Sequence, residues 1–224
     1  MPATAFATIF DAARQRHGVA AIDARLPQPK TASDLAATPD DRYLSQMSLR
    51  IFRAGLKHSL VDAKWPAFEE VFGRFEPRRI RAMSDEALEK LLGDARLIRH
   101  WGKLKSVRDN AAAMLAVAEE FGGFGGWLAT WPGENIVGLW DALADRFSQM
   151  GGVSGPMFLR MVGKDTFVLS KSVIAGLKRW ADMANPPKNR GDRAAAQACF
   201  NAWAAETGRP LSQLSLILAM SVDD

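Results

Sequence analysis

Apolar residues spaced three or four positions apart dominate the hydrophobic pattern of this chain. Phe6, Ile9 and Phe10 recur at the spacing of one helix face, and Gly18 follows them as a helix stop. The strict alternation of apolar and polar residues that marks strands is scarce. We therefore expect an all-α protein.

The same periodicity predicts further helices along the chain. Asp40, Ser84 and Ser170 stand at the starts of three of them and are expected to be their N-caps. The stretch 127–134 is expected to be a connector. We expect a single α-helical domain over residues 1–224; two helical lobes, with the N- and C-terminal helices packed together, are the alternative. The predicted helices cover 40–57, 65–72, 84–94, 102–120, 135–147, 158–163, 171–180, 193–208 and 211–220.

Composition narrows the class of protein. Almost half of the 224 residues are apolar, and seven Trp and twelve Phe can fill a sizeable core. The net charge of +4 is compatible with an anionic partner such as nucleic acid, although many other proteins carry as much. Cys199 is the single cysteine, which excludes an internal disulfide and any multi-thiolate metal site. With no apolar run long enough to span a membrane and no basic leader, we expect a cytoplasmic monomer with no cofactor and no membrane partner.

Several stretches resemble known DNA repair enzymes. The Ala54-Gly55-Leu56 step, the pattern FxxFxPxxI with an acidic helix after it, and LIRHWGK followed by RDNA resemble the DNA-3-methyladenine glycosylase I family. The segment GGVSGPMFLRMVGKDTFVLSKSV, residues 151–173, resembles the hairpin region of the wider helix-hairpin-helix DNA glycosylase superfamily. The resemblance spans about residues 40–175. It implies an all-α, helix-hairpin-helix DNA glycosylase fold.

The resemblance also implies roles for individual side chains. Such enzymes bend DNA, rotate a damaged nucleotide out of the stack and cut its N-glycosidic bond. Leu56 would be the wedge that enters the duplex, whereas the residues alone suggest a core leucine. Arg50 and His58 stand where the family has a pocket glutamate and a stacking tryptophan, so we expect both to contact the base. A partly buried structural histidine is the alternative for His58.

The hairpin is expected to bind the phosphate backbone of double-stranded DNA. Glycines leave backbone N–H groups uncovered, so a phosphate can approach them, although a plain helix end also explains a Gly-rich stretch. Two nearby lysines would add positive charge, or are ordinary solvated lysines. The residues expected to bind DNA are Gly152, Val153, Ser154, Gly155, Lys164 and Lys171.

The chain departs from these relatives at the residues that carry chemistry. The family's zinc site of Cys and His is missing, so no metal is expected. The superfamily's catalytic aspartate falls where this chain reads Ser170-Lys171-Ser172. Pro156 takes the place of the lysine nucleophile of bifunctional members, which argues against a lyase step.

Two side chains are candidates for the role of the missing acid. Arg50, Ala54, His58 and Asp62 are four residues apart and share one face if their helix is continuous. Asp62 would then act as a catalytic group one turn beyond the pocket, with a solvated surface acid as the alternative. Ser172 is the second candidate, because it stands near the superfamily's catalytic position.

These features favour a monofunctional DNA N-glycosylase that excises damaged bases of the 3-methyladenine type in base excision repair. Such bases are already cationic and leave as neutral molecules, so they need little acid help, whereas neutral lesions need more. One alternative is a catalytically silent DNA- or damage-binding protein on the same scaffold. Another is a helical protein that binds no DNA.

Overall fold

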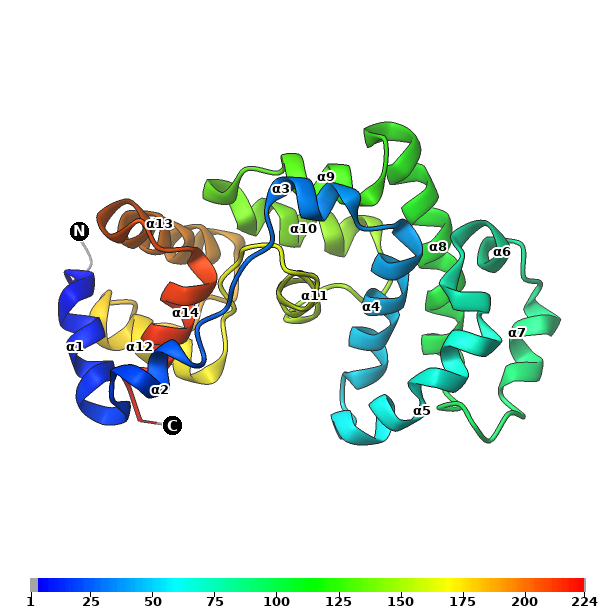
Figure 1. Cartoon of the computed structure of the whole chain (residues 1–224), viewed down its shortest axis with the longest axis horizontal. Helices are drawn as coiled ribbons and strands as arrows, with labels where there is room; N and C mark the ends of the chain where they lie inside the picture. Colours follow the sequence, from blue (N-terminus) through cyan, green and yellow to red (C-terminus); the bar gives the residue numbers. More distant parts are fainter. Residues whose placement is uncertain (1–3, 224) are drawn as a thin grey trace. The chain divides into compact units, whose positions relative to one another are not determined.

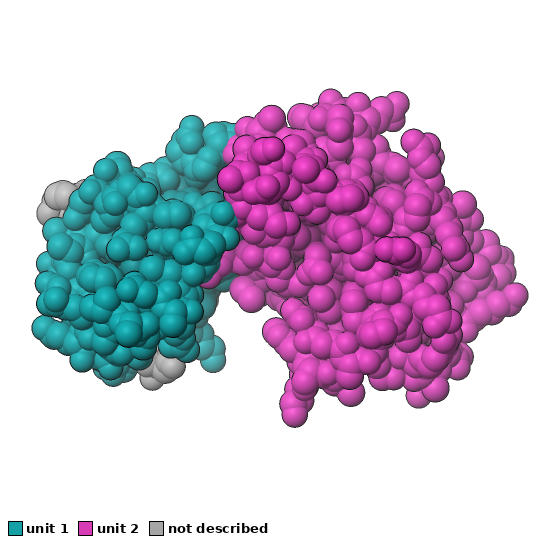
Figure 2. Space-filling view, viewed as in Figure 1, with its two compact units in different colours: residues 1–29, 132–139, 165–224 teal, residues 30–131, 140–164 magenta. Residues whose placement is uncertain are grey.

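The computed structural model describes residues 4–223, and over these residues the chain forms helices joined by turns and loops, with no strand (Figure 1). The expected all-α class is confirmed. The chain divides into two compact units, coloured separately in Figure 2. Unit 1 comprises residues 1–29, 132–139 and 165–224, and unit 2 comprises residues 30–131 and 140–164.

Unit 1 is a group of helices that includes both ends of the described chain. Its elements are α1 (Phe6–His17), α2 (Val19–Asp23), η2 (Gly133–Asn135), the start of α10 (Ile136–Arg146), α12 (Lys171–Trp180), α13 (Arg190–Thr207) and α14 (Leu211–Met220). α1 contacts α13 and α14. The indole Nε1 of Trp203 donates a hydrogen bond to the Thr4 carbonyl at 3.0 Å, and its ring packs against Phe6. The N- and C-terminal helices therefore share one core.

Unit 2 contains most of the segments that carry the resemblance, of which residues 165–173 belong to unit 1. Its elements are α3 (Ala32–Ala37), α4 (Asp40–Arg53), α5 (His58–Val71), η1 (Gly73–Phe75), α6 (Pro77–Arg81), α7 (Asp85–Leu91), α8 (Trp101–Phe121), α9 (Phe124–Thr130), the end of α10 and α11 (Ser154–Val162). α8 contacts α4, α6, α7 and α9, so it is the central helix of the unit. Over residues 4–223, every helix is too short or too polar to span a bilayer.

An aromatic cluster forms the core where α4, α5 and η1 meet. Trp65 stacks on Phe68 and Phe75, with ring centroids 4.9 Å and 5.4 Å apart, and Phe52 meets Phe68 edge-on. Phe72 also packs against Phe75, and both are fully buried. The two phenylalanines of FxxFxPxxI are therefore core residues that bind η1 to α5. Their aromatic character serves packing, because buried rings contribute large apolar area.

Helix caps agree with the sequence at two of three positions. The hydroxyl of Ser84 accepts the N–H of Ala87, and that of Ser170 accepts the N–H of Val173, both at 3.2 Å. These contacts satisfy N–H groups that a helix start leaves without intrahelical partners. α7 and α12 therefore begin where the sequence predicts.

The third predicted cap, Asp40, serves a different helix. Pro39 occupies the N-cap position of α4, and the Asp40 carboxylate accepts the N–H of Phe124, the first residue of α9, at 3.0 Å. α9 also lies close to α3, so close that a side chain at Gly125 would overlap the carbonyl of Leu35. The connector predicted at 127–134 is therefore wrong in its first half. A tertiary contact, which local sequence does not reveal, makes this segment helical.

Candidate functional site

The chain turns sharply between α4 and α5. α4 ends at Arg53, Gly55 adopts φ +76°, and α5 begins at His58. The left-handed backbone at this position suits glycine, since other residues adopt it at a cost. The predicted continuous helix through 57 is therefore wrong, and so is the shared face of Arg50, Ala54, His58 and Asp62 that depended on it.

Charged side chains hold the turn from both sides. The ammonium of Lys103, in the first turn of α8, donates hydrogen bonds to the carbonyls of Ala54 at 2.7 Å and Phe52 at 3.3 Å. Arg53 donates to the Asp62 carboxylate from Nε at 2.8 Å and from Nη2 at 2.7 Å. The last carbonyls of α4 thus gain a cation, which is the favourable charge at a helix C-terminus.

The turn presents apolar and imidazole side chains to solvent. Leu56 is 38% exposed and His58 is exposed. The alternatives of a core leucine and a partly buried structural histidine are therefore wrong. Leu60, which sequence reasoning missed, is 50% exposed and stands four residues after Leu56. No sequence pattern marked it, because Leu60 and Val61 are adjacent apolar residues and only the structure shows that Val61 is the buried one.

Arg50 has an unusual environment for a cation. The residue is only 8% exposed, and its Nε is enclosed without a hydrogen-bond partner. Among the described residues its guanidinium forms no ion pair. Burial, and then the neighbouring charge of Arg53, lower the pKa of Arg50. Burial, and then the charge of Arg50, lower the pKa of Lys103. The two cations stand on helices α4 and α8, which are in contact.

The predicted hairpin is present between α10 and α11. Gly152 adopts φ +61° and nothing lies within 4 Å of the place where its Cβ would be. The N–H of Ser154 donates to the Gly151 carbonyl at 3.2 Å, and that of Gly155 to the Met150 carbonyl at 3.1 Å. Ser154 and Gly155 are also buried, so they shape the turn and their N–H groups are not available to a phosphate.

Backbone N–H groups that could donate to a phosphate lie at the exposed tip of the hairpin. In the described part of the chain the N–H groups of Gly152 and Val153 have no protein acceptor. The Val153 side chain is 54% exposed. Of the four hairpin residues predicted to bind DNA, these two therefore remain suited to it.

Side-chain hydrogen bonds between the hairpin and α8 fix the hairpin within unit 2. The buried Asn110 donates to the Ser148 carbonyl at 3.1 Å and accepts the Ser148 N–H at 2.7 Å. Gln149 donates from Nε2 to the Gly102 carbonyl at 2.8 Å. Asn110 is the third residue of the RDNA stretch. Sequence reasoning used that stretch for resemblance only and missed the function of Asn110 as the clamp of the hairpin turn.

The two predicted DNA-binding lysines differ. Lys164 is buried and its ammonium donates to the Trp131 carbonyl at 2.7 Å, so the alternative of an ordinary solvated lysine is wrong and the ammonium is already engaged by the protein. Its chain position, just after α11, brings it to the end of α9 in the folded unit. Lys171 is exposed as the first residue of α12 and remains available to an anionic partner.

The region of the missing aspartate belongs to unit 1. Ser170 is exposed and its hydroxyl caps α12, while Ser172 is half-buried in the first turn. The only acid nearby in sequence, Asp165, accepts the N–H groups of Leu211 at 2.8 Å and Ser212 at 2.9 Å. Its carboxylate caps α14, which leaves it no free role as an acid.

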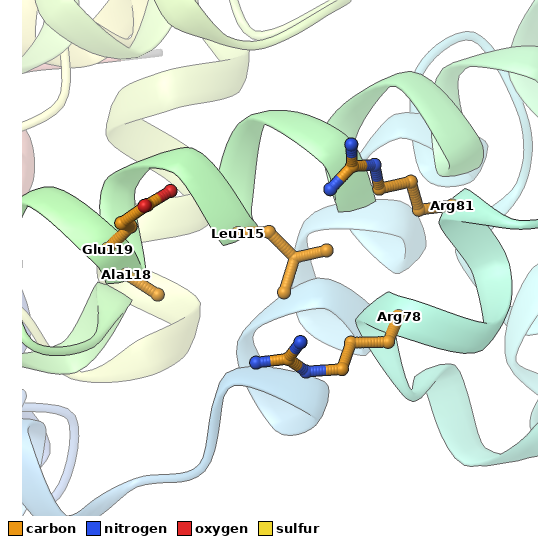
Figure 3. A pocket seen from close by; sticks show the side chains of 5 residues that line it. All are labelled: Arg78, Arg81, Leu115, Ala118 and Glu119. Atoms are coloured by element: carbon orange, nitrogen blue, oxygen red, sulfur yellow. The ribbon is translucent and has the colours of Figure 1, made fainter.

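Within residues 4–223, the turn between α4 and α5 adjoins neither a metal-ligand group nor the cavity between α6 and α8. No group of three or more His, Cys, Asp or Glu suited to a metal ion occurs among residues 4–223. A cavity of about 400 Å³ lies between α6 and α8, where Arg78 and Arg81 flank Leu115 (Figure 3). Leu115 is twelve residues beyond Lys103 in α8, which is about 18 Å along a helix axis. This cavity is therefore remote from the turn between α4 and α5.

The methyladenine glycosylase family matches residues 36–150, just over half of the chain. The chain belongs to this family. The match includes the turn between α4 and α5 and the whole of α8, and it ends at Met150, directly before the tip of the hairpin. The DNA-3-methyladenine glycosylase 1 of Escherichia coli is 32% identical over 82 residues, which are 37% of this chain and 44% of that protein. The chain therefore matches less than half of the length of this relative.

Solved structures with similar folds extend further along the chain. A crystal structure of 3-methyladenine DNA glycosylase I covers 63% of this chain and 84% of its own, with a TM-score of 0.50 and 23% identity. The enzyme from Staphylococcus aureus covers 62% and 80%, with a TM-score of 0.52 and 21% identity. The 8-oxoguanine DNA glycosylase of Methanocaldococcus jannaschii covers 95% and 92%, with a TM-score of 0.53 and 16% identity. The predicted DNA glycosylase fold is confirmed.

Proposed function

We propose that this protein is a monofunctional DNA N-glycosylase that removes alkylated bases of the 3-methyladenine type from double-stranded DNA in base excision repair. The observation that carries the proposal is the family match over residues 36–150, which contains a sharp turn with an exposed leucine. A DNA glycosylase must extract a nucleotide from the stack, and an exposed apolar side chain at a rigid turn is suited to take its place.

The residues of unit 2 support a division of tasks. Leu56 would enter the duplex, and His58, exposed two residues later, would stack on or hydrogen-bond the extruded base. The hairpin tip at Gly152 and Val153 would hold a backbone phosphate through N–H groups. Lys171 of unit 1 would add charge. We also propose that the protein acts as a cytoplasmic monomer without a cofactor.

Cleavage of the N-glycosidic bond of a 3-methylated purine needs little catalytic assistance from the protein. A 3-methylated purine carries a positive charge in DNA and leaves as a neutral base, so the main requirement is stabilisation of the cationic sugar. Asp62 is the candidate carboxylate, and it would act while paired with Arg53. Ser172 would contribute only a hydroxyl. Pro156, the third residue of α11, carries no nucleophilic group, which supports a monofunctional hydrolase.

The test is direct analysis of released bases. Purified protein is incubated with methylated genomic DNA, and the bases set free are identified by mass spectrometry. We expect 3-methyladenine in excess over the enzyme. If no base is released while DNA binding is intact, the protein is instead a silent DNA- or damage-binding member of the family, a function that the Ser170-Lys171-Ser172 sequence favours.

A further inference from the structure

The strongest unexplained feature of unit 2 is a pair of neighbouring buried cations. Arg50 on α4 and Lys103 on α8 are 8% and 9% exposed. Arg50 has no partner among the described residues, and its Nε is enclosed. Enclosing a charge costs free energy unless an opposite charge or hydrogen-bond acceptors compensate it. The folded protein therefore contains an uncompensated positive site.

The nearby groups do not supply an anion to this site. Lys103 uses its ammonium to hold the carbonyls of Phe52 and Ala54. The carboxylate of Asp62 is already bound to Arg53. The positive end of the 21-residue helix α8 adds to the same charge, since Lys103 is in its first turn. Burial is the main reason that the pKa values of Arg50 and Lys103 are both lowered, and a neighbouring cation, Arg53 for Arg50 and Arg50 for Lys103, lowers each further.

We infer that Arg50, supported by Lys103, forms a phosphate-binding site at the end of α4, separate from the hairpin tip. A guanidinium presents a planar set of N–H donors that fits two oxygens of a phosphate. The site adjoins the turn that exposes Leu56, because Lys103 holds the Ala54 carbonyl. A backbone phosphate of DNA near the extruded nucleotide is one source of this ligand, and this source rests on the proposed function. Free phosphate is the other source, and the anion site itself does not depend on glycosylase activity.

The first experiment measures thermal unfolding of the protein in inorganic phosphate against chloride at equal ionic strength. The variants are Arg50→Met and, as a matched control, Lys105→Gln, which removes an exposed charge from the same helix as Lys103. We expect Arg50→Met to have a higher Tm than the parent in chloride, because it removes an uncompensated buried charge. We expect phosphate to raise the Tm of the parent and of Lys105→Gln by more than that of Arg50→Met. A lower Tm for Arg50→Met in chloride, with the same response to phosphate, overturns the proposal.

The second experiment distinguishes the two sources of phosphate. Binding to an undamaged duplex is measured across a salt series for the same three proteins. If DNA is the source, Arg50→Met binds about tenfold more weakly at low salt, and the slope of log affinity against log salt falls by about 1. If the slope is unchanged while the Tm response to phosphate is lost, the site binds free phosphate. Neither measurement requires base release, so a failure of the glycosylase proposal leaves both results interpretable.

Discussion

Arg53 and Asp62 form an ion pair across the turn that separates α4 from α5, with 2.7 Å between Nη2 and Oδ1. The pair joins the last residue of one helix to the second turn of the next, on either side of the exposed Leu56. The Asp62 carboxylate therefore has a structural partner already. Any catalytic contribution from Asp62 must come from a carboxylate that is bound to an arginine.

Replacing Asp62 by asparagine tests that contribution. Because the pair is partly exposed, we expect Asp62→Asn to change the free energy of unfolding by no more than about 1 kcal/mol. We expect its single-turnover rate of 3-methyladenine release to fall about tenfold, which corresponds to about 1.4 kcal/mol in the barrier. Asp109→Asn is the control, since Asp109 forms a comparable exposed pair with Lys105 at 3.1 Å. A rate equal to that of the parent would exclude Asp62 from the mechanism.

Shortening Leu56 tests the wedge. The side chain is exposed, so Leu56→Ala should change stability by about 0.5 kcal/mol or less. We expect base release from duplex DNA to fall about tenfold, equivalent to about 1.4 kcal/mol, because nothing then fills the space left by the extruded nucleotide. Val19→Ala serves as the control, because Val19 is an exposed apolar residue of unit 1, and this variant should release bases at the parent rate. Unaltered release by Leu56→Ala would show that this leucine does not enter the duplex.

A charge at the hairpin tip tests phosphate binding there. Val153 has ordinary helical backbone angles and an exposed side chain, so Val153→Asp and Val153→Asn should both fold. We expect only the aspartate to weaken duplex binding, by about tenfold at low salt, since its charge repels a phosphate. Equal binding by the two variants would remove the tip from the interface. Gly155→Asp is unsuitable, because its Cβ would lie 3.1 Å from the Met150 carbonyl and would bury an unpaired acid.

A panel of lesions tests the argument from charge. Oligonucleotides with 3-methyladenine, uracil or hypoxanthine are compared with the parent and with Ser172→Asp. We expect the parent to release both neutral bases at least about 100-fold more slowly than 3-methyladenine, because they need acid catalysis that the site does not provide. Ser172→Asp should raise release of the neutral bases, and an acid in the first turn of α12 is compatible with the helix dipole. Efficient release of uracil or hypoxanthine by the parent contradicts the argument.

Much of the candidate site was predictable from short stretches of sequence. The Ala54-Gly55-Leu56 step pointed to the family and to Leu56, although the helix predicted through residue 57 missed the turn that Gly55 makes there. The Gly-rich stretch at 151–155 located the hairpin, because glycine is favoured where the backbone is left-handed. The roles of individual residues were less predictable. Ser154 and Gly155 proved to be buried within the turn, and Lys164 proved to be bound to a carbonyl in its own unit.

The sequence by itself determined the all-α class, the caps of α7 and α12, and the family, because each depends on residues close together in the chain. Only the tertiary structure decided that the predicted helix breaks after Arg53, that Asp40 caps α9, and that Asn110 clamps the hairpin. It also decided that Arg50 is buried without a partner. The physical reason is the same in each case: these outcomes depend on which distant groups the folded chain brings within hydrogen-bond distance, and local periodicity carries no information about them.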